Sequence, residues 1–130
     1  MSSKLMRAAG GAVVPAAGVG RRLQGGRHKA LILLRGRPLV VHAIEALRRV
    51  PAIRWIVVAA HPRDRTRLER VVRRRRLRNV TVVEGGPSRA ESVARGIRAL
   101  PPEARWVLVH DGARPCLSRR LVEETLRAAR

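Results

Sequence analysis

The chain has 130 residues, 45% of them hydrophobic, which is enough to bury roughly two thirds of its surface in one globular domain and argues against disorder. It carries 29 Lys and Arg residues against 9 Asp and Glu, for a formal net charge of +20. Lysine occurs only at positions 4 and 29, so 29 minus 2 leaves 27 arginines. This excess of guanidinium groups favours anionic partners.

Cysteine usage and hydropathy exclude further classes of protein. The single cysteine, Cys116, excludes an internal disulfide framework and a cysteine-cluster zinc site. Residues 1–10 lack the apolar stretch of a secretory signal, and no run approaches the roughly 18 apolar residues that cross a membrane. We therefore expect a cytoplasmic protein with no membrane partner.

Four short apolar runs alternate with segments of helical periodicity. The runs are too short for helices, and three of them are rich in β-branched residues or contain tryptophan, which predicts buried strands. Helix ends are marked by Pro38, by the capping box of Ser88 and Glu91, and by the stop at Pro101 and Pro102, and a last helix is predicted to begin after Ser118. Strands are predicted at 12–15, 53–60, 80–83 and 106–109, and helices at 39–47, 68–72, 90–100 (apolar face Ala90, Val93, Ala94, Ile97, Leu100) and after Ser118 (Leu121, Val122, Thr125, Leu126, Ala129).

This alternation predicts the α/β class, with a Rossmann-like, doubly wound and mostly parallel sheet covered on both faces. No repeat, low-complexity linker or second domain is evident, so we expect residues 1–130 to form one nucleotide-binding domain. The right-handed crossover rule leaves few topologies. The commonest of them places the first and fourth strands side by side, with a ligand crevice outside their carboxyl ends.

A glycine-rich, cationic loop over residues 15–29 follows the first predicted strand. Its small residues let backbone N–H groups approach phosphate oxygens, and Arg22 and Lys29 bring two cations to the same anion. Leu23 stands where the dinucleotide fingerprint needs its third glycine, and the Gly-Lys-Ser/Thr close of a P-loop is absent. The loop therefore predicts phosphate binding without a nicotinamide or flavin cofactor and without an ATPase or GTPase motif.

Two other predicted strand ends carry candidate site residues. Asp111, one of two aspartates, follows the fourth strand, where a carboxylate can hold Mg²⁺ against a polyphosphate. Residues 84–92 follow the third strand as a tight turn into a capped helix, and the backbone of such a turn can contact a base edge. We expect the three loops to converge on one nucleotide.

The three motifs also occur in the same order as in a known protein family. The chain resembles the 2-C-methyl-D-erythritol 4-phosphate cytidylyltransferase family in three motifs, at residues 14–22 with Lys29, at residues 85–93 and at residues 109–115. The resemblance runs over nearly the whole chain, including Pro38 and His42, and corresponds to the amino-terminal part of that family alone. We therefore expect a nucleotidyltransferase-type sheet that lacks the family's carboxyl-terminal part.

The resemblance implies a Mg²⁺- or other divalent-cation-dependent enzyme of non-mevalonate isoprenoid biosynthesis. It implies transfer of the cytidylyl group of CTP to 2-C-methyl-D-erythritol 4-phosphate with release of pyrophosphate. Under the same interpretation, the chain is alternatively a fragment that binds CTP without turning it over. A ribitol-phosphate cytidylyltransferase is the alternative within the class. The family's homodimer arm and acceptor-positioning residues belong to its carboxyl-terminal part.

By the same resemblance, Arg22 and Lys29 are the catalytic cations at the α-phosphate and Asp111 binds the metal. Ala16, Ala17, Gly86 and Ser92 match positions around the cytosine. The full set of implied nucleotide-binding residues is Pro15, Ala16, Ala17, Gly18, Val19, Gly20, Arg21, Gly85, Gly86, Arg89, Ser92 and Gly112.

The arginine run at 73–76, with further arginines around it, supports a second hypothesis, a basic nucleic-acid-binding domain. Phe and Tyr are absent and both tryptophans fall in predicted strands, so stacking on single-stranded bases is not indicated. We favour a solvated helix face for this run. Nonspecific, salt-sensitive binding to nucleic acid is compatible with it.

Overall fold

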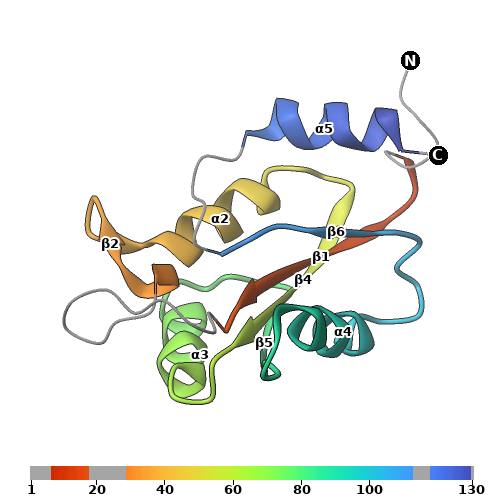
Figure 1. Cartoon of the computed structure of the whole chain (residues 1–130). Helices are drawn as coiled ribbons and strands as arrows, with labels where there is room; N and C mark the ends of the chain where they lie inside the picture. The colour runs from red at the N-terminus through yellow and green to blue at the C-terminus, as the bar shows by residue number, and fades with distance from the viewer. Residues whose placement is uncertain (1–6, 18–28, 113–117, 130) are drawn as a thin grey trace.

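The computed structural model describes residues 7–17, 29–112 and 118–129; of Lys29 it describes the backbone but not the side chain. Strands β1 (Gly10–Ala16), β4 (Ile53–Ala60), β5 (Val80–Glu84) and β6 (Val107–Val109) form a sheet in the order β5-β4-β1-β6, with every pair parallel (Figure 1). Each predicted strand is present within three residues of its expected ends. The predicted α/β class is confirmed, and so is the predicted pairing of the first and fourth of these strands.

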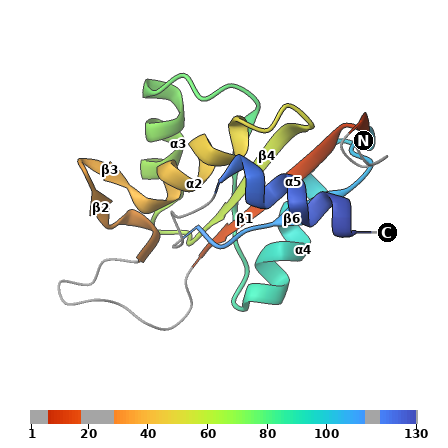
Figure 2. The same ribbon diagram turned by 90° about the horizontal axis from the view of Figure 1, so that it is seen from above.

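The helices are α2 (Leu39–Arg48), α3 (Arg65–Arg74), α4 (Arg89–Ala99) and α5 (Arg119–Ala128), and α4 lies on the opposite side of the sheet from α2 and α3 (Figure 2). No helix in the described ranges is long and apolar enough to cross a membrane. We call the two sides of the sheet the three-helix face, which α2, α3 and α5 cover, and the α4 face. On the three-helix face, apolar side chains of the helices pack against apolar side chains of the strands, including Ile44, Leu47, Val58, Leu68, Val122 and Leu126.

The α4 face differs from its prediction. The residues of α4 that are buried are Ser92 and Gly96, whereas Ile97, expected on the apolar side, is 44% exposed. A Cβ on Gly96 would overlap Cγ1 of Val13, so the helix backbone itself lies against β1. Glycine in a helix interior costs roughly 0.5–1 kcal/mol relative to alanine, so this close approach is the reason for its presence. The predicted apolar face of α4 is therefore wrong in part, because the sheet selects the small side chains.

Cover on the α4 face is also less complete than predicted. Val107 and Val109 of β6 align with Gly11 and Val13 of β1 and point to the same side of the sheet. Each of the two valines is 37% exposed, since α4 packs against β1, β4 and β5 instead. Within the described residues, the sheet is thus covered on both faces at its centre and open on the α4 face at β6.

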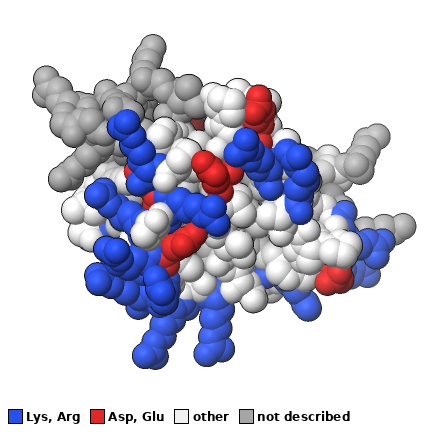
Figure 3. Space-filling view, turned by 90° about the horizontal axis from the view of Figure 1, so that it is seen from below, with Lys and Arg blue, Asp and Glu red and all other residues white. Residues whose placement is uncertain are grey.

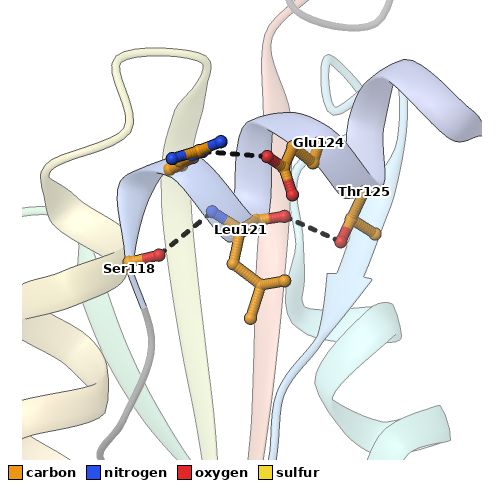
Figure 4. A network of polar contacts seen from close by, with 5 residues as sticks. Ser118, Leu121, Glu124 and Thr125 are labelled. Carbon is orange, nitrogen blue, oxygen red and sulfur yellow. Dashed lines mark hydrogen bonds and ion pairs between the residues drawn. The ribbon is translucent and has the colours of Figure 1, made fainter.

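Polar caps fix the ends of α4 and α5 where the sequence predicts them. The hydroxyl Oγ of Ser88 accepts a hydrogen bond from Glu91 N at 3.1 Å, and Ser118 Oγ accepts one from Leu121 N at 3.1 Å (Figure 4). Thr125 Oγ1 donates to the Leu121 carbonyl at 2.9 Å, and both residues are exposed. Of the face predicted for α5, the structure buries Val122 and Leu126.

A small hairpin before α2 was not predicted. It follows the 3-10 turn η1 (Lys29–Leu31) and consists of β2 (Leu33–Leu34) paired antiparallel with β3 (Arg37–Pro38). The two turn residues, Arg35 and Gly36, have φ values of 52° and 79°. A two-residue turn with both φ values positive matches the twist of antiparallel strands, and glycine favours this geometry. Pro38 is consequently the N-cap of α2, one residue before the predicted first-turn position.

Candidate active site

The end of β1 forms the centre of the predicted site. β1 lies between β4 and β6, and its last residue, Ala16, aligns with the last residue of β4, Ala60. Ala16 is 5% exposed and the following Ala17 is 3% exposed. Because the parallel strands end at one edge, the loops after β1, β5 and β6 emerge there, as the fold class predicts.

The turn between β5 and α4 packs directly against this end of β1. Gly85 N donates to the Ala60 carbonyl at 2.7 Å, which places the turn beside the last pair of strand residues. A Cβ on Gly85 would lie 2.7 Å from Ala17 Cβ and 2.9 Å from Ser92 Oγ, closer than real side chains approach. Two predicted site segments are thus in contact, and a side chain at Gly85 would separate them.

A buried serine holds the turn in place. Ser92 is 1% exposed, and its Oγ accepts a hydrogen bond from Gly86 N at 3.0 Å and lies 3.3 Å from the Gly86 carbonyl, to which it can donate. The guanidinium of Arg95, an exposed residue of α4, donates a hydrogen bond to the Gly85 carbonyl at 3.1 Å. Sequence reasoning selected Ser92 but missed Arg95, since nothing in the sequence distinguishes it among 27 arginines.

The segment after β6 approaches β1 from the other side. His110 N donates to the Val13 carbonyl at 3.0 Å, and Gly112 N donates to the Pro15 carbonyl at 3.1 Å. A Cβ on Gly112 would lie 3.3 Å from Ala16 Cβ, so this glycine packs closely on the strand end. Asp111 lies between these two backbone anchors and is half-buried.

The structure therefore brings together three of the predicted segments, at residues 15–17, 85–92 and 111–112. Arg89 is exposed at the first turn of α4, on the same side of the sheet as Ser92. The other predicted residues lie outside the described part of the chain: Gly18, Val19, Gly20, Arg21, Arg22 and the side chain of Lys29.

The carboxylates of the described part offer a limited set of metal ligands. No group of three or more His, Cys, Asp or Glu side chains among the described residues is arranged to hold a metal ion. Mg²⁺ in nucleotide sites commonly takes one or two carboxylates and completes its shell with phosphate oxygens and water. One aspartate, Asp111, held at the strand end by backbone bonds on either side, is compatible with that pattern.

Comparison with known proteins identifies the family. The family model described as 2-C-methyl-D-erythritol 4-phosphate cytidylyltransferase (IspD) matches residues 11–130. The chain belongs to this family. The resemblance seen in the sequence motifs is thereby confirmed.

Relatives within the cytidylyltransferase family match over less than their full length. The chain is 44% identical over 106 residues to the 2-C-methyl-D-erythritol 4-phosphate cytidylyltransferase of Klebsiella pneumoniae, covering 82% of this chain and 44% of that protein. It is 46% identical over 112 residues to the Frankia casuarinae protein of the same name, covering 86% of this chain and 41% of that protein.

The fold comparison agrees with the sequence comparison. The crystal structure of 4-diphosphocytidyl-2C-methyl-D-erythritol synthase from Anaerococcus prevotii superimposes with a TM-score of 0.77 at 27% identity, covering 93% of this chain and 51% of that one. The nucleotidyltransferase-type fold is confirmed. The chain spans about half the length of the relatives it matches.

Proposed function

We propose that this chain binds CTP with Mg²⁺ at the carboxyl edge of its sheet and contributes that site to cytidylyl transfer onto 2-C-methyl-D-erythritol 4-phosphate. The observation that carries the proposal is the convergence of three segments on the end of β1. Gly85 packs on Ala17 from one side and Gly112 packs on Ala16 from the other. Membership of the cytidylyltransferase family supports CTP as the nucleotide.

Small residues and backbone carbonyls suit the nucleoside end of CTP. The N–H groups of Gly85 and Gly86 are already bound to the Ala60 carbonyl and to Ser92 Oγ, which holds the turn rigid. The turn therefore offers a base its two backbone carbonyls, each with a second lone pair, beside the buried methyl of Ala17. Cytosine carries an amino donor where uracil carries a carbonyl acceptor, so backbone carbonyls favour cytosine. We assign this turn to the base and Gly112 to the ribose.

Cations suit the triphosphate end. In this proposal the loop at 18–21 binds the phosphates through its N–H groups, and Arg22 and Lys29 neutralise charge that develops at the α-phosphate. When bound, the metal supplies further positive charge to the triphosphate, and Asp111 is the residue that would hold it.

The proposed reaction needs positioning and charge neutralisation more than acid–base chemistry. An oxygen of the acceptor phosphate attacks the α-phosphorus of CTP, a new P–O bond forms, and the bond to pyrophosphate breaks. No general base is needed, because the attacking phosphate oxygen is already ionised. A well-placed cation in phosphoryl transfer accelerates the reaction by roughly 10³- to 10⁵-fold, so Arg22 and Lys29 are expected to affect the rate far more than folding.

Thermal unfolding with and without nucleotide tests the proposed site. CTP with Mg²⁺ at about 100 times its Kd is expected to stabilise the protein by about 2.7 kcal/mol. UTP is expected to stabilise it less. Arg22→Ala and Lys29→Ala each remove the effect, whereas the control Arg127→Ala, an exposed arginine of α5, leaves it intact. Equal stabilisation by CTP in the parent chain and in all three variants contradicts the proposal.

The metal assignment has its own test. Asp111→Asn keeps the size of the side chain and removes its charge, so stabilisation by CTP should no longer depend on Mg²⁺. Glu103→Gln, at an exposed carboxylate in the turn before β6, is the matched control. A variant that keeps the full Mg²⁺ dependence would exclude Asp111 as a metal ligand.

Acceptor choice separates the two cytidylyltransferase alternatives. Release of pyrophosphate from CTP is measured with 2-C-methyl-D-erythritol 4-phosphate and with ribitol phosphate in parallel. Turnover with the first alone supports the proposed acceptor, and turnover with ribitol phosphate alone supports the alternative. CTP stabilisation without turnover on either acceptor supports a chain that binds the nucleotide without completing the reaction.

A further inference from the structure

A hollow of about 600 Å³ lies at the other edge of the sheet, where α2 and α3 end and β4 and β5 begin. It is lined by Glu45, Arg48, Arg49, Arg75 and Leu77. All three arginines are exposed. Glu45 is already paired with the guanidinium of Arg37 at 2.6 Å. None of the ion pairs within the described part of the chain involves the three arginines, so their charge is uncompensated there.

More arginines extend this charge along α3 and the turn that follows it. Figure 3 shows Lys and Arg side chains gathered over α3, at the lower left of the view. The one carboxylate within α3, Glu69, is paired with Arg65 at 2.8 Å. We define the arginine surface as the exposed residues Arg48, Arg49, Arg67, Arg70, Arg73, Arg74, Arg75, Arg76 and Arg78.

The turn after α3 holds part of this surface on a fixed backbone. Leu77 is 6% exposed, and its N donates to the Val72 carbonyl at 3.1 Å, which ties the turn to the helix. Arg76 and Asn79 have φ values of 51° and 61°, so the chain reverses on both sides of the buried leucine. The arginines of the turn are therefore presented together, beside those at the end of α2.

We propose that the arginine surface binds the phosphate backbone of double-stranded nucleic acid without reading its sequence. Guanidinium groups bind phosphate oxygens in a bidentate geometry, and a duplex carries about one charge per 1.7 Å of its axis. The ten residues of α3 span about 15 Å, and the hollow extends the charged surface beyond them. That extent matches several successive phosphates better than a single small anion.

Composition favours a duplex over a single strand. The chain has no Phe or Tyr, and its two tryptophans, Trp55 and Trp106, are partly buried. Single-strand binding without sequence preference relies on aromatic side chains on which bases stack. The hollow lies at the opposite edge of the sheet from Ala17 and Asp111, so a duplex centred on it would leave the proposed CTP site open.

Fluorescence anisotropy with a labelled, mixed-sequence DNA duplex tests the proposal over a range of salt concentrations. The triple variant Arg48→Gln, Arg49→Gln, Arg75→Gln removes the arginines of the hollow. We expect its affinity to fall by roughly tenfold or more and the slope of log K against log salt to become shallower by roughly 3. The matched control removes the same charge from exposed residues elsewhere: Arg105→Gln, Arg120→Gln, Arg127→Gln.

The control is expected to lose no more than about threefold in affinity, as a change in overall charge alone would produce. Equal losses in the two triple variants would overturn the proposal, because binding would then follow net charge and not this surface. Tighter binding of a single strand of the same length would overturn it too, as would binding of heparin or polyphosphate without the duplex. Unchanged stabilisation by CTP and Mg²⁺ in the hollow variant, relative to the parent chain, shows that it is folded.

Discussion

The two faces of the sheet are packed in different ways. On the three-helix face, large aliphatic side chains such as Ile44, Leu47 and Leu68 fill the space between helices and strands. On the α4 face, Gly96 brings the helix backbone against Val13, and a serine, Ser92, takes the buried position one turn earlier. Packing on the three-helix face depends on the volume of large side chains. Packing on the α4 face depends on small residues that let the helix backbone approach the strand.

This difference explains why the candidate site lies next to α4. Close approach of α4 places Ser92 beneath the turn at Gly85 and Gly86, and that turn then reaches the end of β1. A bulkier helix face would push the turn away from Ala17. Substitutions that add volume on the α4 face are therefore expected to disturb the turn at Gly85 and Gly86. Substitutions that remove volume on the three-helix face, away from the side chains that Gly112 contacts, are expected to affect stability alone.

The largest effect is expected from Leu47→Ala on the three-helix face. Leu47 is fully buried, and truncation of such a leucine lowers the free energy of unfolding by about 2–5 kcal/mol. Urea unfolding followed by circular dichroism measures the loss. Leu121→Ala, at a residue 49% exposed, is the control and should change it far less. Equal losses for the two variants would contradict this account of the core.

Ser92→Ala is expected to lower the free energy of unfolding by about 1–3 kcal/mol, because Gly86 N loses its partner in a buried position. It is also expected to weaken stabilisation by CTP. The control Ser88→Ala removes an exposed helix cap at a cost of about 1 kcal/mol and keeps the turn intact. If both variants respond equally to CTP, Ser92 does not position the turn for the nucleotide.

Gly96→Ala tests the close approach directly. The added methyl overlaps Val13 and costs about 1–3 kcal/mol, offset by about 1 kcal/mol of helix propensity, so the net loss is about 0–2 kcal/mol. The double variant Gly96→Ala, Val13→Ala supplies the missing space, and a double-mutant cycle from urea unfolding measures the coupling. A coupling energy near zero would refute direct packing of α4 on β1.

The smallest effect is expected at the open part of the α4 face. Val107→Thr changes a residue that is 37% exposed on an edge strand, so the free energy of unfolding should change by no more than about 0.5 kcal/mol. Exposed apolar edges favour association between chains, so Val107→Lys is expected to lower light scattering at high protein concentration. Unchanged scattering would show that this edge does not drive association.

Local pattern was enough to predict most of the fold. The strand at 53–60 was predicted with its exact ends. The cap at Ser88 marked the start of α4 correctly, and the helix predicted after Ser118 is α5. The hairpin at 33–38 was missed, because each of its strands has two residues and offers no periodicity to detect.

The sequence also selected the residues of the candidate site. Glycines, Asp111 and Ser92 stood out because their types and spacing at strand ends are unusual, and the resemblance to the family assigned them roles. The contact of Arg95 with the Gly85 carbonyl and the gathering of Arg48 and Arg49 with Arg75 join residues far apart in the sequence. Sequence spacing alone carries no signal for such contacts.

The sequence by itself determined the alternation of strands and helices, the family and the positions of the small residues, because hydrophobic period, capping and backbone freedom are local properties. Only the tertiary structure decided that α4 turns its small residues inward and leaves Ile97 exposed. It also decided that the segments around Ala17, Gly85 and Gly112 meet. Both outcomes depend on how closely two backbones can approach, which is a property of the packed pair and not of either segment.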